Sequence, residues 1–229
     1  MIGNMKQTRK FICDEKLKLG IRENLDNFQT QAHLKEGVQQ AAVALTIVDV
    51  AHGSDDYGLP SYVKRQPDAA LILTRRSTNL RNHSGQWALP GGRRDRGEKA
   101  ADTALRELSE EVGLSLGPDR VIGTLDDFTT RSGFVITPVV IWGGDRIDLV
   151  PNPAEVASIH RIPIAEFLRS DAPLIHESPD SGAPLILMPV GNTCIAAPTA
   201  ALLYQFREVA LLGKSTRVAH YEQPAFAWE

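Results

Sequence analysis

The chain has 229 residues, of which 42% are hydrophobic and 23% charged, and its net charge is −3. This balance is typical of one soluble globular domain with a substantial core. The slight negative charge argues against a bulk electrostatic attraction to nucleic acid, so we expect no nucleic-acid partner. No apolar run approaches the roughly 18 residues of a membrane span, and charges interrupt residues 1–18, so we expect a cytoplasmic protein without a membrane partner.

The N-terminal part of the sequence differs in character from the rest. Residues 14–38 are polar and charged, and they predict one or two surface helices. We therefore expect an N-terminal helical extension at 1–38 and a main domain at 39–229. Cys13 and Cys194 are the two cysteines of the chain, which favours two free thiols in a reducing compartment over a disulfide scaffold.

The main domain alternates short apolar runs with turn-rich segments. Runs rich in Val, Ile and Leu predict strands at 41–50, 69–74, 87–89, 121–126, 134–142, 156–164 and 185–190. Helical spacing predicts helices at 98–112, 165–169 and 198–213. Gly, Pro, Ser and charged residues predict an irregular insertion at 52–67 and loops at 75–86 and 170–184. This order predicts an α/β (α+β) sandwich.

Three carboxylates cluster on the predicted helix at 98–112. Glu107, Glu110 and Glu111 lie three and four residues apart, which would place them on one face, roughly opposite the apolar face. Like charges at this spacing destabilise a helix by about 0.2–0.5 kcal/mol per pair, and the helix dipole disfavours anions in the last turns. A bound Mg²⁺ or Mn²⁺ would offset that cost. The alternative is a solvated acidic face whose repulsion Arg106 softens.

The residues around these glutamates form a longer pattern, G-x5-E-x7-R-E-U-x-E-E-x-G-U, in which U is aliphatic. The matching residues are Gly92, Glu98, Arg106, Glu107, Leu108, Glu110, Glu111, Gly113 and Leu114. This pattern resembles the signature of the Nudix hydrolase family. The resemblance implies an α/β/α sandwich with a mixed sheet between helices, Mg²⁺ or Mn²⁺ as cofactor, and hydrolysis of a nucleoside diphosphate linked to another group.

The same resemblance implies roles for the residues of the signature. Glu107, Glu110 and Glu111 would bind the metal, Arg106 would orient the glutamates, and Glu98 would fix the loop before the helix. The catalytic set would be Arg106, Glu107, Glu110 and Glu98. The carboxylate that accepts the proton of the attacking water stays open, and Glu155 is either that base, reaching in from a later loop, or a surface residue.

The stretch before the signature resembles the motif L-L-T-x-R-[SA]-x3-R-x3-G-x3-F-P-G-G of the coenzyme A diphosphatase branch. The matching residues are Leu73, Thr74, Arg76, Ser77, Arg81, Gly85, Pro90, Gly91 and Gly92. Leu89 stands where that branch has Phe, while residues 151–156 resemble its N-P-x-E-V stretch. The resemblance implies that Arg76, Ser77, Arg81, Gly91 and Gly92 bind the substrate.

Basic residues on both sides of this stretch suit a phosphate-rich small-molecule substrate, because guanidinium groups pair well with phosphate oxygens. They are Arg75, Arg76, Arg81, His83, Arg93, Arg94 and Arg96. The alternative is loop charge that balances the acidic helix. Trp87 either stacks on a base or packs in the core.

We therefore expect hydrolysis of coenzyme A or its acyl thioesters to 4′-phosphopantetheine and adenosine 3′,5′-bisphosphate. Two alternatives stay open. Leu89 and the insertion at 52–67 are compatible with ADP-ribose, NADH or a sugar nucleotide as substrate, and a nucleotide-binding regulator without catalysis is the alternative of another class. A homodimer is compatible with the family resemblance.

Overall fold

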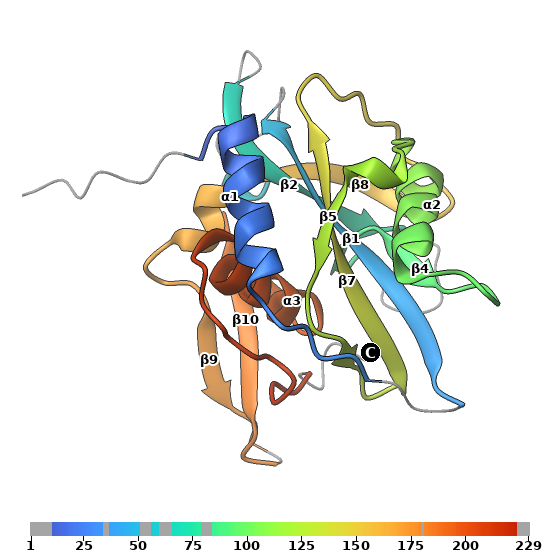
Figure 1. Ribbon diagram of the computed structural model, residues 1–229. Coiled ribbons are helices and arrows are strands. Elements are labelled where there is room, and N and C mark those ends of the chain that lie inside the picture. Colours follow the sequence, from blue (N-terminus) through green and yellow to red (C-terminus); the bar gives the residue numbers. More distant parts are fainter. Residues whose placement is uncertain are drawn as a thin grey trace, which may run out of the picture.

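A mixed β-sheet lies between helices on its two faces (Figure 1). The computed structural model describes residues 11–33, 37–50, 56–59, 66–78, 84–179 and 181–223. The main path of the sheet runs β3-β2-β1-β7-β5, with β4 beside β1, β6 beside β7 and β8 beside β2. Its strands are β1 (Gln39–Val50), β2 (Gln66–Arg76), β3 (Trp87–Ala88), β4 (Gly91–Arg93), β5 (Val121–Thr124), β6 (Phe128–Thr129), β7 (Phe134–Gly144) and β8 (Val156–Pro163). This arrangement confirms the predicted α+β sandwich with a mixed sheet.

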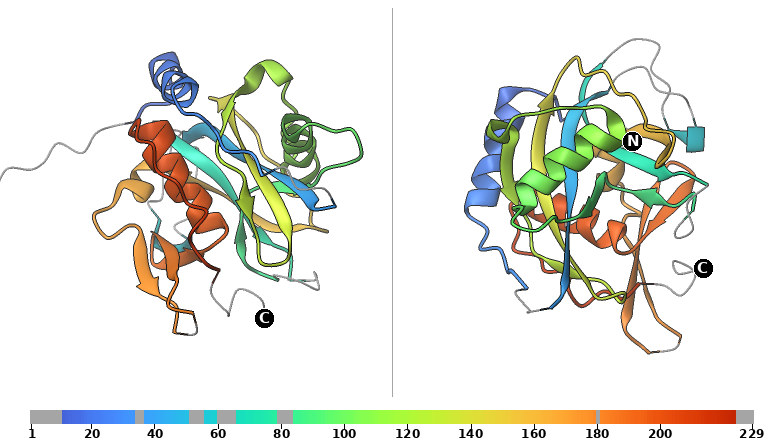
Figure 2. Two further views of the ribbon diagram at one scale, coloured as in Figure 1. Left: turned by 60° about the horizontal axis from the view of Figure 1, so that its bottom comes forward. Right: turned by 90° about the vertical axis from the view of Figure 1, so that its right-hand side faces the viewer.

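The helices divide between the two faces of the sheet, as the two views of Figure 2 show. The helices are α1 (Glu15–Asp26), α2 (Ala100–Val112) and α3 (Thr199–Gln205), and α3 continues as the π-helical segment η4 (Phe206–Leu211). Short 3-10 turns occur at η1 (Asp56–Gly58), η2 (Pro118–Arg120) and η3 (Ile164–Leu168). Leu108 and Val112 of α2 belong to one apolar cluster, together with Val48 and Ile72 of the sheet.

The opposite face of the sheet packs against the N- and C-terminal helices. Ile21 of α1 and Phe206 of η4 join the second apolar cluster, with Leu45 and Leu71 from β1 and β2. Because both faces of β1 are covered, the strand is an almost continuous apolar run rather than an alternating one. Each large side chain buried in this way contributes about 1.5–3 kcal/mol.

The parallel pairing of β1 with β7 sets the position of α2. Ala41 pairs with Ile136 and Leu45 with Val140, in the same chain direction. A parallel pair needs a long crossover connection, and the crossover here carries β2, α2 and β5. The loop that enters α2 therefore lies beside the middle strands of the sheet.

Helix α1 is part of the packed body rather than a detached arm. It begins at Asp14, whose side chain accepts a hydrogen bond of 2.9 Å from the backbone N–H of Leu17. Its Leu25 lies against β5, where a Cβ on Gly123 would come within 2.8 Å of Leu25 Cδ1. The predicted division of the chain at residue 38 stays a prediction, as does the homodimer.

The structure also differs from the sequence expectations in several places. The predicted loop at 170–184 contains β9 (Leu174–Glu177), which forms a three-stranded sheet with β10 (Pro184–Val190) and β11 (Thr193–Ala196). The predicted insertion at 52–67 lies mostly outside the described residues.

Cys13 and Cys194 are free thiols, as expected. None of the helices in the described ranges has the length and apolar character of a membrane-spanning segment.

Candidate active site

Two consecutive glycines bring the backbone of β4 into close contact with β1 and α2. Gly91 and Gly92 pair with Val43 and Ala42 of β1. A Cβ on Gly91 would lie 2.4 Å from the carbonyl oxygen of Ala42, and one on Gly92 would lie 2.2 Å from Oε1 of Glu107. Glycine fits both positions because a side chain at Gly91 would collide with the backbone of β1, and one at Gly92 would displace the carboxylate of Glu107.

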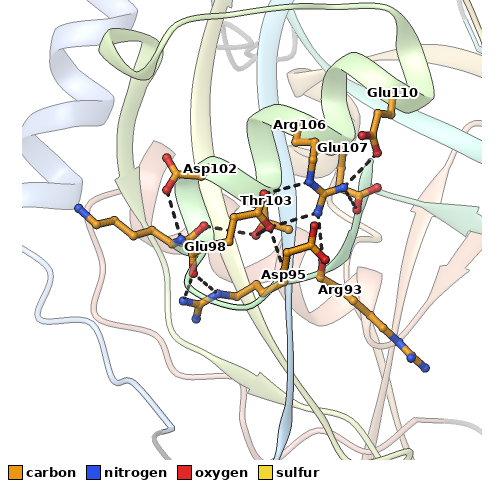
Figure 3. Close-up of polar contacts among 10 residues, drawn as sticks. Arg93, Asp95, Glu98, Asp102, Thr103, Arg106, Glu107 and Glu110 are labelled. Carbon is orange, nitrogen blue, oxygen red and sulfur yellow. Dashed lines mark hydrogen bonds and ion pairs between the residues drawn. The ribbon is translucent and has the colours of Figure 1, made fainter.

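A single arginine ties the loop before α2 to the helix (Figure 3). Arg106 Nε donates to Glu98 Oε1 at 2.9 Å, and its Nη1 donates to Glu107 Oε1 at 2.8 Å and to Glu110 Oε2 at 3.0 Å. Its Nη2 donates to the backbone carbonyl of Arg93 at 3.0 Å. We call Arg106, Glu98 and Glu110 the arginine cluster. These contacts suit the predicted orienting role of Arg106, which stays a prediction.

Glu98 fixes the entry of α2 through contacts on both of its oxygens. In addition to Arg106, its Oε2 accepts hydrogen bonds from the hydroxyl of Thr103 at 2.7 Å and from the backbone N–H of Asp95 at 3.0 Å. The hydrogen bond from Arg106, followed by that from Asp95, lowers the pKa of Glu98 to about 2. Thr103 carries no signal in the sequence pattern, and its role as a support of Glu98 emerges only from the structure.

A second set of carboxylates converges next to this cluster, at the buried face of the same helix. Glu107, Glu111 and Glu155 each offer a carboxylate oxygen, and these oxygens lie within 4.8 Å of one another. Glu107 and Glu111 are buried, whereas Glu155 is exposed. We call these three residues the acidic group. The structure thus joins Glu155, which the sequence left open, to two of the three predicted metal ligands.

The loop that carries Glu155 is attached to the end of α2. The backbone N–H groups of Val150 and Asn152 donate to the carbonyls of Val112 and Glu111, each at 2.9 Å. The N–H of Glu155 then donates to the carbonyl of Asn152 at 3.0 Å. These bonds satisfy the free carbonyls of the last helical turn and hold Glu155 beside the helix.

The acidic group concentrates negative charge that the described residues compensate only in part. Burial, followed by the charges of Glu107 and Glu155, raises the pKa of Glu111 to about 8. Burial also raises the pKa of Glu107, although Arg106 opposes this. Oxygen ligands with uncompensated charge on a rigid helix fit a hard divalent cation such as Mg²⁺ or Mn²⁺. The residues present therefore fit the cofactor that the sequence pattern implies.

The predicted position of the glutamates opposite the apolar face of α2 is wrong for two of them. Glu107 and Glu111 are only 8% and 5% exposed, and they share the buried face with Leu108 and Val112. Each residue advances about 100° around a helix, so Glu111 lies beside Leu108 rather than across from it. Glu110 points outward, its side chain is 53% exposed, and it is not a member of the acidic group. Its predicted metal and catalytic roles stay predictions.

The predicted substrate residues lie next to the acidic group where the structure describes them. The positive charge of Arg76 and a hydrogen bond from the backbone of Gly91 both lower the pKa of Glu111 against its dominant rise. Ser77 is buried, and its N–H donates to the carbonyl of Glu155 at 2.8 Å. Arg81 lies outside the described residues, as does His83.

A pocket of about 290 Å³ opens beside the acidic group. Arg76 and Gly91, which both act on Glu111, line the pocket together with residues of β1, β3, β7 and the start of α3. Residues outside these elements complete its walls, among them Leu89, Thr130, Ser132 and Gln223. Its size approaches that of small-molecule sites in other proteins. Trp87 lines it while only 7% exposed, in edge contact with Tyr57 and His160 at ring separations of 5.1 and 4.8 Å. Trp87 is therefore a core residue with one side facing the pocket.

Comparison with known proteins assigns this arrangement to a family. The NUDIX domain model matches residues 61–180, which is just over half of the chain. The chain therefore belongs to the Nudix family. A MutT/nudix family protein from Enterococcus faecalis has the same fold, with a TM-score of 0.52 and 17% identity over 79% of this chain and 65% of that chain.

Curated relatives from bacteria share a higher identity over a shorter region. A protein named "Uncharacterized Nudix hydrolase NudL" from Yersinia enterocolitica is 43% identical over 105 residues, which are 45% of this chain and 54% of the relative. The protein of the same name from Photorhabdus laumondii is 42% identical over 104 residues, covering 45% and 56%. The chain thus spans about half the length of the curated relatives that it matches.

Proposed function

We propose that the chain hydrolyses the diphosphate bond of coenzyme A or its acyl thioesters, giving 4′-phosphopantetheine or its acyl form and adenosine 3′,5′-bisphosphate. The observation that carries this proposal is the position of the acidic group beside a pocket that Arg76 and Gly91 line. Carboxylates that can hold a cation lie here next to a guanidinium that can pair with phosphate, which is the combination that diphosphate hydrolysis needs.

The acidic group would hold Mg²⁺ or Mn²⁺ through Glu107 and Glu111, with a smaller contribution from Glu110, which points outward, and with Glu155 beside the cation. When bound, such a cation polarises a phosphoryl oxygen and lowers the pKa of a neighbouring water. The side chains of the chain do the remaining work. Arg76 neutralises charge on the diphosphate. Gly91 lets the backbone of β4 lie close to β1, and Arg106 of the arginine cluster holds Glu107 in place.

A carboxylate must also accept the proton of the attacking water. We assign this role to Glu155, because it is the member of the acidic group that solvent reaches. The hydrogen bond from Ser77 to its backbone carbonyl and the attachment of its loop to α2 restrict its position. Such restriction favours proton transfer within a fixed geometry.

The choice of coenzyme A rests on the resemblance of residues 72–92 to the coenzyme A diphosphatase motif. The two described ends of this stretch lie at the site, since Arg76 ends β2 and Leu89 and Gly91 line the pocket. Leu89 replaces an aromatic residue of that motif directly in the pocket wall, and this observation favours ADP-ribose, NADH or a sugar nucleotide as the second candidate substrate class.

A substrate panel tests the proposal. Purified protein with Mg²⁺ is incubated with coenzyme A, acetyl coenzyme A, ADP-ribose, NADH and a sugar nucleotide, and the products are analysed by mass spectrometry. We expect adenosine 3′,5′-bisphosphate from the coenzyme A compounds as the fastest product. Turnover of ADP-ribose far above that of coenzyme A would overturn the substrate assignment, and no metal-dependent turnover of any compound would favour a regulator without catalysis.

A further inference from the structure

Three residues that line the pocket each carry a buried nitrogen donor without a hydrogen-bond partner in the described part of the chain. They are Nε of Arg76, Nε1 of Trp87 and Nε2 of Gln223. Buried polar groups in native proteins are almost always paired, so each unpaired group calls for an explanation. Here all three belong to one cavity, which makes a ligand with hydrogen-bond acceptors the simplest explanation.

Gln223 reaches this pocket from a part of the chain far from the Nudix signature. It lies beyond residues 61–180, the region that the NUDIX domain model matches. The preceding residue, Glu222, forms a bridge with Leu185 of β10, and its N–H donates to the carbonyl of Pro184 at 2.9 Å. This attachment places the Gln223 side chain in the pocket wall with 7% exposure.

The two ends of the pocket differ in chemistry. Arg76 and Gly91 lie at the end near the acidic group, where a diphosphate carries charge. Phe134 and Leu202 are among the apolar residues of the walls, so most of the cavity suits an uncharged group. The side chains of Trp87 and Gln223 form part of this wall and carry buried, unpaired N–H groups.

We propose that Trp87 and Gln223 form a recognition pair for the uncharged organic group attached to the diphosphate. The group would carry hydrogen-bond acceptors, either amide carbonyl oxygens or aromatic ring nitrogens, on a largely apolar body. Within coenzyme A, the pantetheine arm and the adenine base both meet this description. The inference rests on the proposed function and adds a specificity-determining residue from the C-terminal segment.

Substitutions that remove one donor and leave an apolar or aromatic side chain test the pair. We expect Gln223→Met and Trp87→Phe each to raise the KM of the cleaved substrate about 3- to 10-fold, the effect of one lost hydrogen bond, with kcat within about 2-fold of the wild type. Glu222→Gln is the matched control, because Glu222 pairs with Ser181 at 2.7 Å outside the pocket. Unchanged KM in both pocket variants would overturn the proposal.

Calorimetry with the two halves of the substrate identifies the group that is recognised. The wild type and both variants are titrated with 4′-phosphopantetheine and with adenosine 3′,5′-bisphosphate. We expect both variants to weaken the same half about 3- to 10-fold and to leave the other unchanged. If neither half binds the wild type more tightly than it binds the variants, the recognition pair is refuted even if one variant folds poorly.

Failure of the recognition pair can be distinguished from failure of the proposed function. If the panel shows that another diphosphate is cleaved instead of coenzyme A, the assigned reaction fails, and the KM comparison is made with that compound. If coenzyme A is cleaved and the KM of both variants stays at the wild-type value, the reaction stands and the pair fails alone.

Discussion

Glu98 precedes α2 and Glu111 lies near the end of that helix. Their surroundings shift the pKa of the same type of side chain in opposite directions. Hydrogen bonds from Arg106 and Asp95 hold the pKa of Glu98 near 2. Burial, with Glu107 and Glu155 nearby, raises the pKa of Glu111 to about 8. The charge of Glu98 is therefore compensated within the arginine cluster, whereas the charge of the acidic group is offset only in part by its described neighbours. Two glutamates of one signature thus differ in how far their charge is compensated, which residue type alone does not reveal.

The largest expected effect comes from removing a charge of the acidic group. Glu111→Gln should lower kcat/KM by more than about 100-fold, since loss of partners outside the ligand set already costs about 10- to 100-fold. Glu110→Gln, in the arginine cluster, should cost less than about 10-fold. Steady-state kinetics with Mg²⁺ measure both. Equal losses of kcat/KM would mean that Glu110 binds the cation as strongly as Glu111, and the separation of the arginine cluster from the acidic group would not hold.

A side chain added at Gly92, where the arginine cluster meets the acidic group, should have the next largest effect on activity. Gly92→Ala places a Cβ 2.2 Å from Glu107 Oε1, so we expect kcat/KM to fall about 10- to 100-fold as this carboxylate is displaced. Gly20→Ala on α1 is the matched control, because nothing lies within 4 Å of its Cβ. The control should gain about 0.5–1 kcal/mol of unfolding free energy. Full activity of Gly92→Ala would show that the position of Glu107 is not critical.

The unfolding free energy with and without Mg²⁺ distinguishes the acidic group from the arginine cluster. Mg²⁺ at 100 times its Kd should raise the unfolding free energy of the wild type by about 2.7 kcal/mol, and a chelator should reverse the gain. Glu111→Gln should lose most of this gain, while Glu98→Gln should keep it. Urea unfolding with and without Mg²⁺ gives these values. A gain that both variants retain would place the cation elsewhere.

The smallest effect concerns pH. Because the folded pKa of Glu98 lies below its ordinary value of 4.5, its ionised form stabilises the folded state at neutral pH, and this contribution is lost as the pH falls from about 4.5 towards 2. Glu98→Gln should lower the unfolding free energy by about 1.5–3 kcal/mol at pH 7 and by nearly nothing at pH 2. A difference independent of pH would mean that the contacts of Glu98 do not depend on its charge.

The sequence predicts α2 well because several signals agree there. The apolar spacing and Gly113, which ends the helix with a φ of 70°, specify the same element that the structure shows. The face of Glu107 and Glu111 was predicted wrongly because carboxylates are usually solvated, and only tertiary packing reveals that these two are buried. Glu155 could not be assigned either, since its approach depends on where the loop before β8 meets α2.

The shorter elements escaped prediction for related reasons. Gly91 and Gly92 carry no strand signal, yet they form β4 because the absence of side chains lets them pair closely with β1. β9 lies in a segment whose composition is that of a loop, and its pairing with β10 is what makes it a strand. Gln223 has no local signal at all, because its place in the pocket wall results from the bridge at Glu222.

The two bonds from Val150 and Asn152 to the end of α2 also bear on how this scaffold could diversify. They separate the exposed bend at Asp145 and Arg146 from the turn that carries Glu155. Residues inserted at that bend would extend into solvent at a small entropic cost while the anchored turn kept its place. New chain could thus be added after β7 without moving Glu155 or the end of α2.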